Sequence, residues 1–200
     1  MGRTNTREIV HLVASLIVLT IAFTYPSLSP EEMAIVAVGV GTGFLLHELA
    51  HKFTAQRYGY AADYEASPLG LLMALGMSVL TNGGFVFAAP GAVMIRGKMV
   101  YSPYEDYFDS QKTAKEFAYI SVSGALVNLT LAILFYSGSL FTADILVYKI
   151  LRTGAFINVF LAGFNMIPFG PLDGAKVWHY NRTMWAAVFI PAIILFVLMR

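Results

Sequence analysis

The sequence has no cysteine among its 200 residues. Disulfide bonds and thiolate metal ligands are therefore excluded, and a transition metal would have to be held by histidine nitrogens and carboxylate oxygens. Charge is also scarce, because Asp, Glu, Lys and Arg make up 12% of the chain, against about a quarter in a soluble globular protein. The net charge of +1 gives no basis for nucleic-acid binding.

Hydrophobic residues, by contrast, make up 58% of the chain. Because about 20 consecutive apolar residues span a bilayer as a helix, we predict an all-α polytopic membrane protein with about five to six transmembrane helices. The whole chain, residues 1–200, is expected to form one integral-membrane domain. The candidate spans are Glu8–Tyr25, Met33–Ala55, Phe117–Ser137, Arg152–Pro168 and Arg182–Arg200.

One apolar region does not fit a simple span. Pro68–Leu80 is too short to cross, and Thr81–Gly84 interrupts it. Phe85–Ala88 and Val93–Ile95 flank Ala89–Ala92, whose Pro-Gly pair favours a type II turn, so we predict a short β-hairpin. Because unpaired edge amides cannot face lipid, this hairpin must be re-entrant or interfacial, pack against the helices, or receive another strand.

The second candidate span ends in His47-Glu48-Leu49-Ala50-His51. This H-E-x-x-H spacing places two imidazoles on one helix face with a carboxylate beside them, the pattern of a zinc site with a general base. Ionisable side chains are costly within a membrane and usually functional there. Two core histidines bonded to backbone carbonyls are the alternative, which the intervening Glu48 disfavours in a chain of four histidines.

Charge predicts on which side of the membrane this motif lies. Arg3 and Arg7 precede the first span, and Glu31 and Glu32 follow it, so the positive-inside rule places the N-terminus in the cytoplasm. The second span then runs inward, and the motif lies near its cytoplasmic end.

A catalytic zinc usually has three protein ligands. Asp173 follows the fourth span and reaches the depth of the two histidines if Pro68–Ile95 makes no net crossing. Pro168 and Pro171 interrupt regular helix there and can direct the carboxylate inward. His179 is the rival ligand, although its polar surroundings suggest the membrane interface, and a turn or cap role is the alternative for Asp173.

Two motifs together now resemble a known family. The H-E-L-A-H segment, followed by N-x-x-P-x-x-P-L-D-G at Asn165–Gly174, resembles the site-2 proteases, which are intramembrane zinc metalloproteases. The resemblance covers about Gly39 to Lys176, with a catalytic core at about residues 33–176, in a minimal form without a PDZ or CBS domain. It implies one Zn²⁺ per chain, held by His47, His51 and Asp173, with Glu48 activating water.

Two asparagines are candidates for stabilising the oxyanion of the reaction. Asn165 is the first choice. For Asn128 an interhelical hydrogen bond is an equal alternative. Ser123–Asn128 looks like the G-P-x-x-N element of the family, with Ala125 where proline is usual, and Ala175 replaces a frequent second glycine; neither departure affects a ligand.

These observations predict an intramembrane zinc endopeptidase. It is expected to lie in the cell membrane as a multi-pass protein, with the active site towards the cytoplasm, and to cleave a membrane-protein substrate in or near a transmembrane segment. The substrate must be extended at the cleaved bond, and the Phe85–Ile95 hairpin would supply an edge for strand addition, as the resemblance also implies. The alternatives are a zinc-binding module without catalysis and a metal transporter, which should show repeat-related ligands at mid-membrane. The sequence predicts no oligomeric state.

Overall fold

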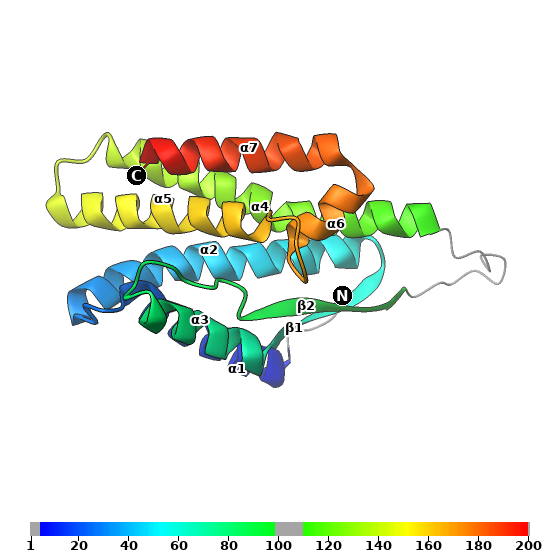
Figure 1. Ribbon diagram of the computed structural model, residues 1–200, viewed down its shortest axis with the longest axis horizontal. Helices are drawn as coiled ribbons and strands as arrows, with labels where there is room; N and C mark the ends of the chain where they lie inside the picture. The colour runs from blue at the N-terminus through cyan, green and yellow to red at the C-terminus, as the bar shows by residue number, and fades with distance from the viewer. Residues whose placement is uncertain (1–4, 99–109, 200) are drawn as a thin grey trace.

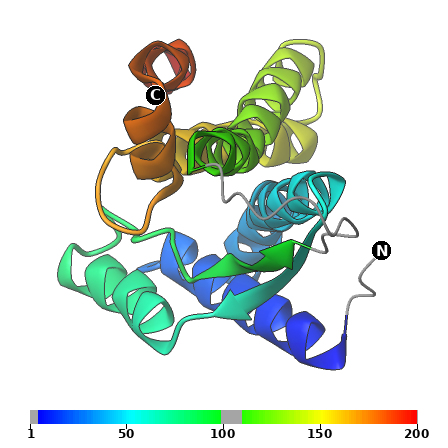
Figure 2. The ribbon, with the colours of Figure 1, turned by 90° about the vertical axis from the view of Figure 1, so that its right-hand side faces the viewer.

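The computed structural model describes residues 5–98 and 110–199, which form seven helices and a two-stranded sheet. In Figure 1, α4, α5, α6 and α7 lie on one side of α2, and α1, α3 and the sheet lie on the other. The end view in Figure 2 shows the same two tiers. The elements are α1 (Thr6–Thr24), α2 (Pro30–Arg57), β1 (Tyr60–Ala66), α3 (Pro68–Leu80), β2 (Gly91–Lys98), α4 (Ser110–Ser139), α5 (Ile145–Asn165), α6 (Asp173–Tyr180) and α7 (Arg182–Met199).

Five of these helices, α1, α2, α4, α5 and α7, are long and apolar enough to cross a membrane. The predicted mostly helical, multi-pass architecture is therefore confirmed. The fourth span differs from its expected bounds, since α5 begins at Ile145 and ends at Asn165. It begins early because the Asp144 side chain accepts a hydrogen bond from Val147 N at 2.9 Å, which caps the first turn.

The sheet is not the predicted hairpin. β2 pairs antiparallel with β1, with Tyr64 opposite Val93 and Ala66 opposite Gly91, so the predicted pairing of Phe85–Ala88 with Val93–Ile95 is wrong. Ser67 N donates to Pro90 O at 2.8 Å, which extends the ladder with β1. The Pro90-Gly91 pair therefore leads into β2 and does not form a hairpin turn. The segment instead pairs with another strand, which was one of the expected alternatives.

The segment between the two strands makes no net crossing. The hydrogen bond from Ser67 to Pro90 joins its two ends. Between them α3 runs along α1, where Ser78 Oγ donates to Ala22 O at 2.7 Å, and the chain then returns through residues 85–89. The rings of Phe85 and Phe87 on this return pack against Phe164 of α5. The segment thus returns to the side that it left, which is the condition under which Asp173 reaches the level of the histidines.

Small residues let α2 pack closely against α5. A Cβ added to Gly39 would lie 2.9 Å from Ile157 Cδ1, and one added to Gly43 would lie 2.9 Å from Leu161 Cδ1. Gly39 and Gly43 thus form a packing face of α2. Helix α2 consequently lies at the centre of the molecule, with the H-E-x-x-H motif buried in its C-terminal half.

Candidate metal centre

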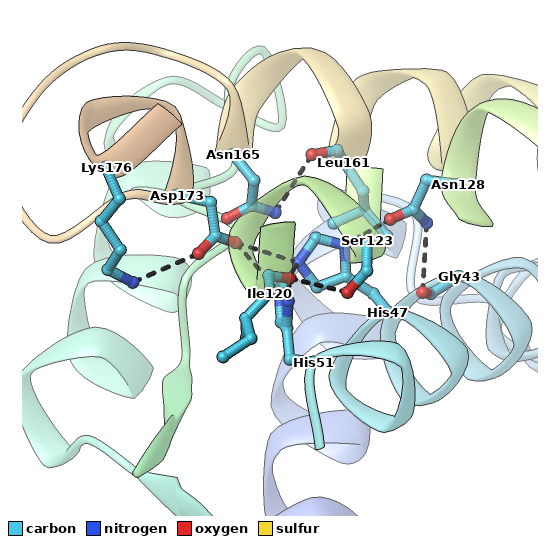
Figure 3. A network of polar contacts seen from close by, with 10 residues as sticks. All are labelled: Gly43, His47, His51, Ile120, Ser123, Asn128, Leu161, Asn165, Asp173 and Lys176. Atoms are coloured by element: carbon cyan, nitrogen blue, oxygen red, sulfur yellow. Dashed lines mark hydrogen bonds and ion pairs between the residues drawn. The ribbon is translucent and has the colours of Figure 1, made fainter. Parts of the chain in front are cut away.

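Three side chains from two distant parts of the chain meet at one point (Figure 3). The Nε2 atoms of His47 and His51 are 2.9 Å apart. Oδ2 of Asp173 lies 2.9 Å from Nε2 of His51 and 3.5 Å from Nε2 of His47. Within the described part of the chain, this is the group of histidine and carboxylate atoms that could hold a metal ion.

The backbone around α6 brings Asp173 to this point. Asp173 is the first residue of α6. A Cβ on Gly174 would collide with Met166 O, so glycine allows α6 to begin directly against the end of α5. Trp185 Nε1 on α7 also donates to Met166 O at 2.7 Å and fixes this connection. His179, the rival ligand, is exposed on α6 and is not part of the cluster.

The second ring nitrogen of each histidine fixes its tautomer. Nδ1 of His51 lies 2.7 Å from Ile120 O, and Nδ1 of His47 lies 2.5 Å from Asn128 Oδ1. Because these oxygens can only accept, both Nδ1 atoms carry the proton and both Nε2 atoms present lone pairs. Such bonds orient the histidine ligands of metal sites.

The three lone-pair donors fit a zinc ion. Two Nε2 atoms and a carboxylate oxygen crowd together and repel one another unless a cation lies between them. Two histidines and one carboxylate are a common protein ligand set for catalytic zinc.

Glu48 lies beside the cluster with an unsatisfied oxygen. Its side chain is 9% exposed, and Oε2 has no hydrogen-bond partner, a condition that it shares in the described residues with Gln56 Nε2. An unpaired buried carboxylate oxygen is costly. Glu48 lines the same cavity as the three candidate ligands. Glu48 is therefore placed where a water could satisfy it.

The two candidate asparagines occupy different places. Asn165 lines the cavity and donates one amide hydrogen to Leu161 O at 3.0 Å. Asn128 is fully buried, and its Nδ2 donates to Gly43 O at 3.1 Å and to Asn158 Oδ1 at 3.0 Å. Both of its amide hydrogens are thus occupied, so Asn128 orients His47 and has no donor left for an oxyanion.

Gly124 explains how α4 approaches the histidines. A Cβ at this position would lie 2.6 Å from His47 Cε1 and 2.7 Å from His51 Cε1. Both rings therefore rest on the bare backbone of α4. The next residue, Ala125, is fully buried in an uninterrupted helix, so alanine in place of proline leaves α4 regular.

A cavity of about 330 Å³ opens beside the cluster. One wall is polar and contains the candidate ligands, Glu48, Asn165 and Lys176. The rest of the lining is mostly apolar, and most of it comes from α3, the returning segment and β2. Its residues include Leu69, Met73, Phe87, Gly91, Val93 and Ile95.

The outer edge of β1 is closed by side chains of α1. Tyr64 N donates to Glu8 Oε1 at 3.1 Å, and Ala66 N donates to His11 Nδ1 at 3.3 Å. These amides point away from β2, so each pairs with a side chain in place of a third strand.

The outer edge of β2 has no pairing partner in the part of the chain that the structure describes. In an antiparallel pair, residues opposite each other point their backbone groups in the same sense, inward or outward. Because Tyr64 and Ala66 point outward, so do their partners Val93 and Gly91, and Ile95 follows two residues on. These three residues line the cavity, and no described residue bonds to their outward groups.

Two buried polar contacts have little sequence signal. Lys52 looks like a cytoplasmic surface charge, yet it is 3% exposed and forms an ion pair with Glu8. The sequence feature that could have indicated this ion pair was Glu8, an acidic residue inside a candidate span. Asn158, which bonds to Asn128, is an ordinary polar residue in an apolar run and carries no motif.

The chain is similar to a protein of Methanocaldococcus jannaschii that carries the name "Putative zinc metalloprotease". The two are 38% identical over 192 residues, which cover 96% of this chain and 93% of the other. Neither a family model nor a solved structure matches the chain.

Proposed function

This chain belongs to the zinc metalloprotease family of that Methanocaldococcus jannaschii protein, and from this premise we propose that it is a site-2-protease-like intramembrane zinc endopeptidase. The observation that carries the proposal is the convergence of His47, His51 and Asp173 beside a cavity. Both histidines belong to a helix that can span a membrane. One Zn²⁺ per chain fits the three donors.

The residues around the cluster suit hydrolysis of a peptide bond. When bound, zinc supplies the Lewis acidity that activates water and polarises the scissile carbonyl. Glu48, with its unpaired Oε2, accepts the proton of the attacking water and passes it to the leaving amine. Asn165 is the candidate donor to the oxyanion, because it reaches the cavity from α5.

We propose that the substrate binds as an extended strand along the outer edge of β2. A transmembrane helix hides its carbonyls in its own hydrogen bonds, so the cleaved region must unwind. The outward groups of Gly91, Val93 and Ile95 offer a pairing edge along the cavity that the candidate zinc ligands line. Because Glu8 and His11 close the edge of β1, a substrate strand can add at β2 only. The substrate class is a membrane protein cleaved in or near a transmembrane segment.

The proposed orientation places the active site towards the cytoplasm. Arg7 lies at the start of α1, and Glu31 and Glu32 lie in the first turn of α2. Arg57 ends α2 on the same side as Arg7, which agrees with the positive-inside rule. Lys52 is buried and therefore adds nothing to this charge bias.

Glu48→Gln tests the proposal. The protein, in liposomes with zinc, is mixed with a set of single-span reporter proteins, and cleavage is followed by mass spectrometry. Glu48→Gln should lower cleavage by at least about 10²–10⁴-fold, the usual contribution of a general base, while zinc stays bound. Glu32→Gln, at an exposed acid on the same helix, is the matched control and should cleave normally.

Two outcomes would contradict the proposal. Cleavage that survives Glu48→Gln would remove Glu48 from the chemistry. A zinc-loaded wild type that cleaves no reporter would favour a zinc-binding module without catalysis, and zinc flux across the same liposomes would favour a transporter.

A further inference from the structure

Asn158 is a buried amide that contacts neither the candidate ligands nor the cavity. It lies on α5 with 0% exposure. Its Oδ1 accepts from Asn128 Nδ2 at 3.0 Å, and its Nδ2 donates to Gly154 O at 2.9 Å. Polar groups inside a membrane helix bundle are costly unless paired and are commonly functional. We propose that Asn158 is a positioning residue that fixes the tautomer of His47 through Asn128; this rests on the proposed zinc site.

The direction of each hydrogen bond follows from the backbone. Gly154 O can only accept, so the atom of Asn158 beside it is Nδ2, and Oδ1 faces Asn128. Gly43 O likewise requires Nδ2 of Asn128. The oxygen of Asn128 is then left for Nδ1 of His47, which must carry the proton. Nε2 of His47 is thereby kept as a lone pair for the metal.

The alternative orientation of Asn128 shows what Asn158 prevents. A flipped amide would place Oδ1 of Asn128 against two acceptors, Gly43 O and Asn158 Oδ1. It would also present a donor to His47 Nδ1, which would move the histidine proton to Nε2, where the metal binds. Without Asn158, only Gly43 O remains to repel Oδ1 of a flipped Asn128. The population of the flipped orientation should therefore increase.

His47 is the ligand that needs this control. His51 bonds to the backbone oxygen of Ile120, which cannot flip. His47 bonds to a side-chain amide, which can. Glycine at position 43, one turn before His47, admits the arrangement, because an added Cβ would lie 3.1 Å from Asn158 Oδ1. Helices α2, α4 and α5 are thus joined by Gly43, Asn128 and Asn158 at the level of the metal site.

The test compares two substitutions at Asn158 with a remote control. Asn158→Leu keeps the approximate size and removes the acceptor. Asn158→Asp, held as the neutral acid in this apolar interior, can accept from Asn128 and donate to Gly154 O. Ser78→Ala removes another buried interhelical hydrogen bond, between α3 and α1, far from the cluster in sequence.

Zinc affinity and the histidine tautomer are the readouts. Asn158→Leu should raise the zinc dissociation constant by about 10–100-fold, as losing an outer-shell partner does, whereas Asn158→Asp and Ser78→Ala should leave it near the wild-type value. ¹⁵N NMR of histidine-labelled protein should show His47 with its proton on Nδ1, assigned among four histidines by substitution.

Wild-type zinc affinity in folded Asn158→Leu protein would overturn the inference. If that variant does not fold, the ¹⁵N NMR measurement on the wild-type protein decides. A His47 proton found on Nε2 would then overturn the inference. Neither readout requires proteolysis, so a zinc-binding protein that cleaves nothing would contradict the proposed function and leave this inference intact.

Discussion

Lys52 Nζ lies 2.6 Å from Glu8 Oε2, and each side chain is 3% exposed within a helix able to span a membrane. The other oxygen of Glu8 accepts from Tyr64 N of β1. One carboxylate thus joins α1, the residue after His51 on α2, and the sheet. This contact fixes the sheet relative to the candidate metal centre.

Breaking this pair should destabilise the protein strongly. Glu8→Ala leaves Lys52 as a buried charge without its main partner, which should cost about 3–5 kcal/mol of unfolding free energy. The double variant Glu8→Met with Lys52→Met should recover most of it, because an apolar pair replaces an ion pair at little cost. Denaturant titration in detergent measures both; equal losses in the single and double variants would contradict the prediction.

Asp173→Ala should release zinc. Loss of a direct ligand should weaken zinc binding by more than about 100-fold, the upper range for an outer-shell partner. His179→Gln on the same helix is the control and should bind zinc normally, since His179 is exposed and outside the cluster. Zinc content after dialysis measures both, and the reverse pattern would make His179 the third ligand.

Gly124→Ala should displace the two imidazoles. The added Cβ would lie 2.6 Å from His47 Cε1, so the rings or α4 must shift, and zinc affinity should fall by at least about tenfold. Gly138→Ala, also on α4, adds a Cβ at an ordinary 3.5 Å from Leu151 and should leave the affinity unchanged. Equal affinities for the two variants would show that the site tolerates the shift.

Val93→Pro tests strand addition. Proline removes the outward N–H of Val93 without removing a hydrogen bond to β1, a position that an edge strand tolerates. Cleavage should fall while zinc binding and stability persist. Met94→Ala is the control, because its half-exposed side chain lies at a neighbouring position and its backbone stays intact. Undiminished cleavage by Val93→Pro would exclude pairing at that amide.

Asn165→Ala tests the oxyanion donor. If Asn165 contacts the transition state, kcat should fall by about 10²–10³-fold, whereas KM and zinc content should change little. A change confined to KM would instead assign Asn165 to substrate binding.

The sequence predicted the parts of this protein that depend on neighbouring residues. Apolar runs gave the five spans, because the need to satisfy backbone groups in lipid makes each run helical by itself. The spacing of His47 and His51 follows from the helix repeat. Asp173 could be predicted as a ligand because residues 68–95 were expected to make no net crossing. That topology places Asp173 at the depth of the two histidines.

The tertiary structure decided which distant groups bond to one another. Tyr60–Ala66 pairs with β2 across an intervening helix, Glu8 meets Lys52 across 44 residues, and Asn128 reaches His47 across 81. No local pattern encodes these choices, because a buried polar group accepts whichever partner packing brings to it. The sequence by itself determined the chemistry of the candidate site. Packing determined the tautomers of its ligands and left the outer edge of β2 without a partner among the described residues.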